Sequence, residues 1–131
     1  MVIAMIDHIR LSQQAKDQLT QLKRKTKLTH FNEICRWAFC LSLAESSAPS
    51  VKNFRNDSPL EMSWRVFGGK YQDVYLALLK QRCVNDGLAL DPETLAEQLK
   101  LHLHRGIGYL ASDTELKNIS HLLKKVLVVP N

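Results

Sequence analysis

The chain has 131 residues, of which 45% are hydrophobic and 24% are charged. A chain of this length buries about two-thirds of its unfolded surface, so we expect a single domain over residues 1–131. Eighteen lysines and arginines against thirteen acids leave a net charge of +5, which favours nucleic acid as a partner, with an anionic membrane surface as the alternative. Three cysteines at spacings of five and forty-three residues exclude both a disulfide framework and a CxxC pair.

The apolar N-terminal residues 1–6 do not form the core of a signal peptide, because Asp7, His8 and Arg10 follow at once. No later stretch approaches the roughly 18 apolar residues of a membrane span. We therefore expect a cytoplasmic protein with no membrane partner, in a reducing compartment.

The first 45 residues predict a short strand, a helix, a turn and a second helix. Alternating polarity over residues 3–11 indicates the strand. Ser12 is a suitable N-cap for a helix that should run to about Lys25, and Thr29 is the expected N-cap of a second helix ending near Ala44. The residues that recur at helical spacing, and that we expect to be buried, are Ala15, Leu19, Leu22, Thr26, Ile34, Trp37, Ala38 and Leu41.

Residues 46–57 are rich in Ser, Pro and Asn and predict a long loop. A short helix or a strand should lie between Pro59 and Gly68. Residues 70–85 predict a helix, with Gly87 in a left-handed conformation after it.

The clearest helix begins at Asp91-Pro92, and we expect it to end at Gly106. Gly106 and Gly108 are interpreted as a structural turn, with Gly106 in the left-handed position. The Ser-x-x-Glu spacing of residues 112–115 indicates a capping box for a last helix ending near Val126. The fold class is therefore mainly α, with a strand and two helices at residues 1–45 followed by a further helical portion of the same domain.

Five basic residues fall within twelve positions, with Asp17 as the only acid among them. Three of them, Lys16, Lys23 and Lys27, lie within about 40° of one another on a helical wheel, provided that the helix reaches residue 27. Such a ridge can lie along a phosphate backbone, and Arg10 on the preceding strand can join it. The alternative is a solvated helix face. The predicted DNA-binding residues are Arg10, Lys16, Lys23, Arg24, Lys25 and Lys27.

No motif for metal binding or catalysis is present in the sequence. His102 and His104 are two residues apart and would point about 200° from each other on a helix, and there is no HExxH or CxxC pair. There is also no GxSxG elbow, no phosphate-binding loop and no closely spaced carboxylate pair. We expect no metal, no cofactor and no catalytic residue.

Four segments of the sequence stand out: IDHIRLS at residues 6–12, CRWAFCLSL at 35–43, WRVFGG at 64–69 and LHLHRGIGYL at 101–110. In this order they resemble the DndE family of bacterial DNA phosphorothioation proteins. The resemblance covers nearly the whole chain, and four separate segments in the same order are far more specific than the basic ridge.

The resemblance implies a non-catalytic accessory subunit of the system that replaces a non-bridging oxygen of the DNA backbone phosphate by sulfur. Other proteins of that system, among them a cysteine desulfurase and an iron–sulfur protein, would carry the sulfur chemistry. The resemblance further implies binding of duplex DNA through surface lysines, with a preference for nicked duplex. It also implies a ribbon-helix-helix-like N-terminal unit and assembly as a homo-oligomer, a tetramer. In a ribbon-helix-helix dimer the strand pairs across a two-fold axis, which would place two copies of Arg10 and of the first helix on one surface.

Two other functions remain open from the sequence. A DNA-nicking enzyme of the same system would need an acidic metal cluster or an activated nucleophile, which the scattered acids supply only if a subunit interface brings them together. An assembly adaptor would hold the other modification proteins together, with incidental charge.

Overall fold

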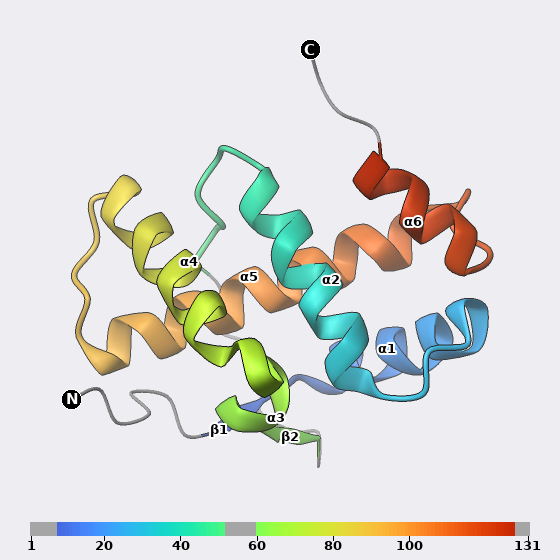
Figure 1. The fold of residues 1–131 in the computed structure, drawn as a ribbon, viewed down its shortest axis with the longest axis horizontal. Coiled ribbons are helices and arrows are strands. Elements are labelled where there is room, and N and C mark those ends of the chain that lie inside the picture. The colour runs from blue at the N-terminus through green and yellow to red at the C-terminus, as the bar shows by residue number, and fades with distance from the viewer. Residues whose placement is uncertain (1–7, 52–59, 128–131) are drawn as a thin grey trace.

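The computed structural model describes residues 8–51 and 60–127, and most of them lie in helices (Figure 1). Helices α2 and α5 make the most extensive contact between any two elements and form the centre of the fold. The predicted mainly α class is confirmed. The elements are β1 (His8–Arg10), α1 (Gln13–Thr26), α2 (Phe31–Ala44), β2 (Glu61–Ser63), α3 (Trp64–Gly68), the 3-10 helix η1 (Gly69–Tyr71), α4 (Gln72–Asn85), α5 (Pro92–Ser112) and α6 (Ile119–Leu127).

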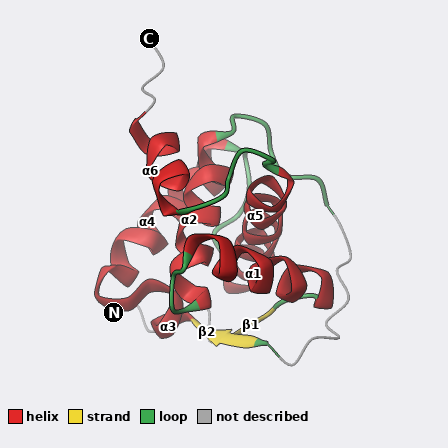
Figure 2. Cartoon of the chain, turned by 90° about the vertical axis from the view of Figure 1, so that its right-hand side faces the viewer, coloured by secondary structure: helices red, strands yellow, loops and turns green. Residues whose placement is uncertain are grey.

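The strand β1 pairs with β2 of the same chain in an antiparallel ladder (Figure 2). Ile9 lies opposite Met62 in this ladder, and both side chains are buried against the core. The strand predicted over residues 3–11 is thus present at 8–10, whereas residues 3–7 lie outside the described part of the chain. One edge of β1 is occupied within the chain, and pairing across a two-fold axis stays a prediction.

The order strand, helix, turn, helix is confirmed for the first half. The Ser12 hydroxyl accepts the backbone N–H of Ala15 at 3.1 Å and caps α1, as predicted. Helix α2 begins one residue later than predicted, with His30 and not Thr29 at its N-cap. The reason is that the Thr29 hydroxyl donates to the Glu33 carboxylate, which also accepts the His30 N–H at 3.0 Å.

The side chains predicted to be buried in these two helices line the core. Those of α1 are all buried, as are Ile34 and Ala38 of α2, while Trp37 and Leu41 are partly buried against the core. A strand and a short helix were the alternatives predicted between Pro59 and Gly68, and both are present, because β2 is followed directly by α3. Gly87, with φ +76°, ends α4 as predicted.

The predicted turn at Gly106 and Gly108 is wrong, because α5 continues through both residues to Ser112. Positive φ angles among the described glycines occur at Gly69 and Gly87 instead. Gly106 lies where α5 crosses α2, and a Cβ atom on it would come within 1.8 Å of the Ala38 carbonyl oxygen. The residue is therefore a site of close helix packing, since only glycine leaves room for the backbone of α2 there.

The predicted capping box at residues 112–115 is also wrong. Ser112 is the last residue of α5, and residues 113–118 connect to a helix that begins at Ile119. The Asn118 side-chain oxygen accepts the N–H of His121 at 3.2 Å and takes the capping role. Among the described residues, no helix is both long and apolar enough to cross a membrane.

Candidate nucleic-acid interface

Helix α1 carries Lys16 and Lys23 on one flank of its packed face, with Arg24 opposite that face and Lys25 on the other flank. Leu19 and Leu22 anchor it in the core. Lys16, in the first half of the helix, is half-buried. The remaining cations gather at the C-terminal end, where all four side chains are exposed; we call Lys23, Arg24, Lys25 and Lys27 the basic cluster.

The geometry of this cluster differs from the predicted ridge. Helix α1 ends at Thr26, and Lys27 adopts a left-handed conformation with φ 60° as its C-cap. The N–H of Lys27 donates to the Lys23 carbonyl at 2.9 Å. Lys16 and Lys23, about 20° apart on the helix, do share an azimuth as predicted. Lys27 lies beyond the helix, so the cations form a compact group at the helix end, with Lys16 about 10 Å away along the axis.

The electrostatics of the basic cluster have two components. The C-terminal end of a helix carries a partial negative charge, which stabilises cations in its last turn. Within residues 8–51 and 60–127, however, no member of the cluster forms an ion pair with an acidic side chain. The Lys23 ammonium lies 5.1 Å from the centre of the Phe31 ring, which holds it in place without neutralising it. The cluster is therefore a compact positive surface with the chemistry to bind phosphates.

Arg10 is separated from the basic cluster. Its guanidinium forms an ion pair with Glu61 on the neighbouring strand at 2.6 Å, and His8 lies 3.5 Å from the same carboxylate. Arg10 lies before the start of α1 and the cluster at its end, and a helix of 14 residues is about 21 Å long. The structure does not bring Arg10 and the cluster into one site.

Both histidines of α5 have structural partners. The His104 Nε2 accepts the Ser12 N–H at 3.2 Å and so holds the start of α1. The His102 Nδ1 lies 2.7 Å from the Ser42 hydroxyl. Burial lowers the pKa of both, that of His102 to about 4, with Arg105 and Arg82 adding to the shift. Within the described residues, no group of three or more His, Cys, Asp or Glu side chains comes together as a metal site would require.

The three cysteine thiols have raised pKa values. Burial raises the pKa of Cys35 to about 12, and burial also raises the pKa of Cys40 and Cys83. A thiol is a nucleophile only as the thiolate, and the raised pKa values lower the thiolate fraction of all three cysteines near neutral pH; Cys35 and Cys83 are also buried, whereas Cys40 is exposed.

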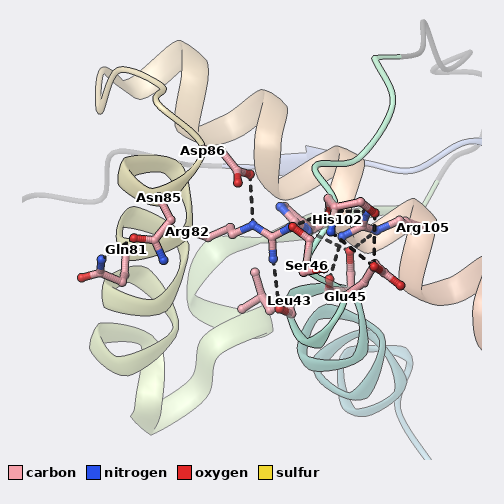
Figure 3. A network of polar contacts seen from close by, with 11 residues as sticks. Leu43, Glu45, Ser46, Gln81, Arg82, Asn85, Asp86, His102 and Arg105 are labelled. Atoms are coloured by element: carbon pink, nitrogen blue, oxygen red, sulfur yellow. Dashed lines mark hydrogen bonds and ion pairs between the residues drawn. The ribbon is translucent and has the colours of Figure 1, made fainter.

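Two arginines that sequence reasoning missed are used inside the fold (Figure 3). Arg82 of α4 donates to the Ser47 carbonyl at 2.6 Å and pairs with Asp86 at 3.0 Å. Arg105 of α5 donates to the same Ser47 carbonyl at 2.8 Å and to the Ser42 carbonyl at 2.7 Å. Both guanidinium groups thus compensate the carbonyl end of α2. Asp86 is only four positions from Arg82, but the oxygens at the end of α2 that these arginines bind lie 35 to 63 positions away in the sequence, so no local pattern marks that role.

A groove of about 320 Å³ opens between the first half of α1 and the second half of α5. Gln14 and Gln18 line one wall, and Tyr109 lines the other. Arg105 also borders the groove, but all three of its side-chain nitrogens already donate to protein oxygens. The groove therefore does not extend the positively charged surface of the basic cluster.

Comparison with known proteins adds to this geometry. A family model described as "DNA sulphur modification protein DndE" matches residues 8–118. The chain is similar to the crystal structure of DndE from Escherichia coli B7A involved in DNA phosphorothioation modification, with 25% identity and a TM-score of 0.67. It is also similar to a DndE mutant, with two glycines replaced by lysine, involved in DNA phosphorothioation, with 26% identity and a TM-score of 0.62. Each similarity covers 79% of this chain and 95% of the other. No protein of curated function matches the chain in sequence.

Proposed function

The chain belongs to the DndE family of DNA sulphur modification proteins, and on that premise we propose that it is a non-catalytic, DNA-binding accessory subunit of the bacterial DNA phosphorothioation system. It would act in the cytoplasm without a cofactor, beside the proteins that carry the sulfur chemistry. As the family resemblance implies, it would assemble as a homo-oligomer, a tetramer.

One observation carries the proposal: four exposed cations, the basic cluster, lie within five residues at the end of α1. No acid among the described residues neutralises them. Exposed cations that repel one another gain free energy when they bind phosphates, because bound counterions are released from the nucleic acid. The overall charge of +5 supports the same partner.

The compactness of the basic cluster supports a preference for nicked duplex. Its helical part, Lys23 to Lys25, spans less than one turn, about 3 Å along the axis. Such a surface reaches few phosphates of a straight, stiff duplex. A break in one strand lowers the energy needed to bend the DNA, and bending brings further phosphates toward the same surface.

The titration behaviour of the candidate nucleophiles supports a role in binding without catalysis. The thiols have raised pKa values and His102 has a lowered one. Near neutral pH, the thiols are therefore protonated and His102 is uncharged. The expected contribution of the protein is to hold DNA in place for its partner proteins.

A salt titration of DNA affinity tests the role of the basic cluster. Removing one lysine that binds a phosphate should reduce the magnitude of the slope of log affinity against log salt by about 0.9. Lys23→Ala, Lys25→Ala and Lys27→Ala should each show this reduction on unrelated duplex sequences. The matched control is Lys70→Ala, because Lys70 lies over the Tyr71 ring at 5.2 Å, much as Lys23 lies over Phe31, but on η1. If the triple alanine variant keeps the parent slope, the cluster is only a solvated helix end.

Three further measurements test the preference for nicked duplex and separate the proposed function from nicking and from assembly. Supercoiled plasmid incubated with the protein and Mg²⁺ or Mn²⁺ should stay supercoiled, and relaxation that a chelator abolishes would show nicking. Titration of matched nicked and intact duplexes should show tighter binding to the nicked form. If cells carrying the triple alanine variant keep both the partner proteins and the DNA modification, the protein is an adaptor.

A further inference from the structure

Helix α4 has an apolar face that no described part of the chain covers. It packs inward through Leu79 and Cys83, which are buried. On the opposite side, Val74 is 54% exposed, Leu78 is 42% exposed and Val84 is 54% exposed. We call the outward residues Val74, Ala77, Leu78, Gln81 and Val84 the α4 face; all of them are uncharged.

This composition is unusual for a helix that faces water. A surface helix usually carries charged or polar side chains opposite its packed face, and a helix that is apolar on all sides is normally buried. Tyr71 at the start of α4 is 58% exposed, and Leu88 and Leu90 beyond its end are also exposed. Exposed apolar side chains gathered on one helix face mark an interaction site.

The charged residues beside the α4 face indicate which partner packs on it. Asp73 and Lys80 are seven residues apart and therefore lie on the same flank, about 20° from each other. Neither forms an ion pair with another described residue. If a second α4 packs antiparallel across a two-fold axis near Ala77, the same flanks meet and Asp73 of each copy lies beside Lys80 of the other. In a parallel pair, opposite flanks meet across the two-fold axis, so Asp73 of one copy would not lie beside Lys80 of the other.

We propose that the α4 face is a self-association surface, on which a second copy of this chain packs its own α4 antiparallel. The α4 faces bury their apolar side chains against each other, and the small side chain of Ala77 allows close approach at the crossing point. Two Asp73–Lys80 ion pairs flank the contact and set its direction. This inference rests on the proposed function and specifies the surface through which the proposed homo-oligomer forms.

The position of α4 fits this role. Figure 1 shows α4 at one edge of the fold and α1 toward the other side, with α2 and α5 between them. Association through α4 therefore leaves the basic cluster of each copy exposed, and it does not bring the two basic clusters together. DNA binding and self-association then use separate surfaces.

Light scattering coupled to size-exclusion chromatography of the full chain, with sedimentation to measure the association constant, tests the inference. Leu78→Asp should shift the wild-type oligomer to a smaller species with an unchanged circular dichroism spectrum, because Leu78 is exposed. Asp73→Lys and Lys80→Glu should each weaken association about tenfold, because each places like charges opposite each other twice per dimer. The double variant Asp73→Lys/Lys80→Glu should restore association. The matched control is Asp17→Lys, the same change at an exposed position of α1, which should leave association unchanged.

Each other outcome overturns a defined part of the inference. A wild-type protein that stays monomeric at every concentration refutes self-association and this surface together. A wild-type oligomer that all the α4 variants leave intact refutes the α4 face, while the homo-oligomer of the proposed function stands. Two single variants that weaken association without recovery in the double variant refute the antiparallel pairing. DNA binding is measured separately, with the alanine variants of the basic cluster.

Discussion

The packing of α5 against α2 makes Gly106 the most sensitive position that we can identify. In Gly106→Ala the added Cβ would lie 1.8 Å from the Ala38 carbonyl oxygen and 2.3 Å from its carbonyl carbon. Real Cβ atoms essentially never approach such atoms closer than 3.0 Å, so the two helix backbones must separate by about 1.2 Å at a densely packed crossing.

The expected cost follows from two opposing terms. Overpacking at this crossing should destabilise the fold by about 3 kcal/mol. Alanine recovers about 1 kcal/mol of that through its better helix propensity. The net loss in the free energy of unfolding is therefore about 2 kcal/mol, and for a chain of this size the melting temperature should fall by about 8 °C.

Gly108→Ala is the matched control, because Gly108 lies on the same helix two residues further on and no atom would lie within 4 Å of its Cβ. That variant should gain about 0.5 to 1 kcal/mol, since glycine is a poor residue within a helix. Thermal unfolding followed by circular dichroism measures both variants. If Gly106→Ala melts at or above the wild-type temperature, or if both variants shift in the same direction, the close approach at Ala38 is not a constraint.

Further predictions concern the polar groups that hold the helices. Arg82→Met should lower the free energy of unfolding by about 3 to 5 kcal/mol, because it leaves Asp86 nearly buried without its partner, whereas exposed Gln81→Ala should change it by under about 0.5 kcal/mol in urea unfolding. The pKa of His102 is lowered from 6.5 to about 4 in the folded state, so the unfolded chain binds the extra proton first as the pH falls. Stability should therefore decrease from pH 6.5 toward pH 4, and urea unfolding of His102→Asn across this window should show a weaker pH dependence; an unchanged dependence would contradict the assignment. Ser12→Ala should lower the free energy of unfolding by about 1 kcal/mol, because α1 loses its N-cap. An unchanged free energy of unfolding would mean that water replaces the hydroxyl.

Local signals predicted the first two helices well. The Ser12 cap and the spacing of Ala15, Leu19 and Leu22 are determined by neighbouring residues, and the structure confirms them. The start of α5 at Asp91-Pro92 was predictable for the same reason, because the Asp91 carboxylate accepts the Thr94 N–H three residues on.

The wrong prediction at Gly106 depended on a contact with a distant residue. A glycine in a helical pattern indicates either a stop or a close packing site, and only the position of Ala38 on another helix decides between them. The pairing of β1 with β2 and the contacts of Arg82 with backbone carbonyls near the end of α2 are equally non-local. The basic nature of the candidate DNA-binding residues was evident from the sequence. The separation of Arg10 from the others was not, because it depends on the folded path of the chain.

The small sheet has a consequence for the order in which the molecule folds. Arg10 and Glu61, which meet across the two strands, are 51 residues apart in the sequence. Closing a loop of that length in an unfolded chain costs about 3.5 kcal/mol of entropy beyond a constant term, and a ladder of three residue pairs returns little of it. Helices α1 and α2 lie between the strands, and their local contacts can form first and shorten the effective loop. The two strands should therefore join late in folding, and their amide hydrogens should exchange with solvent sooner than those at the crossing of α2 and α5.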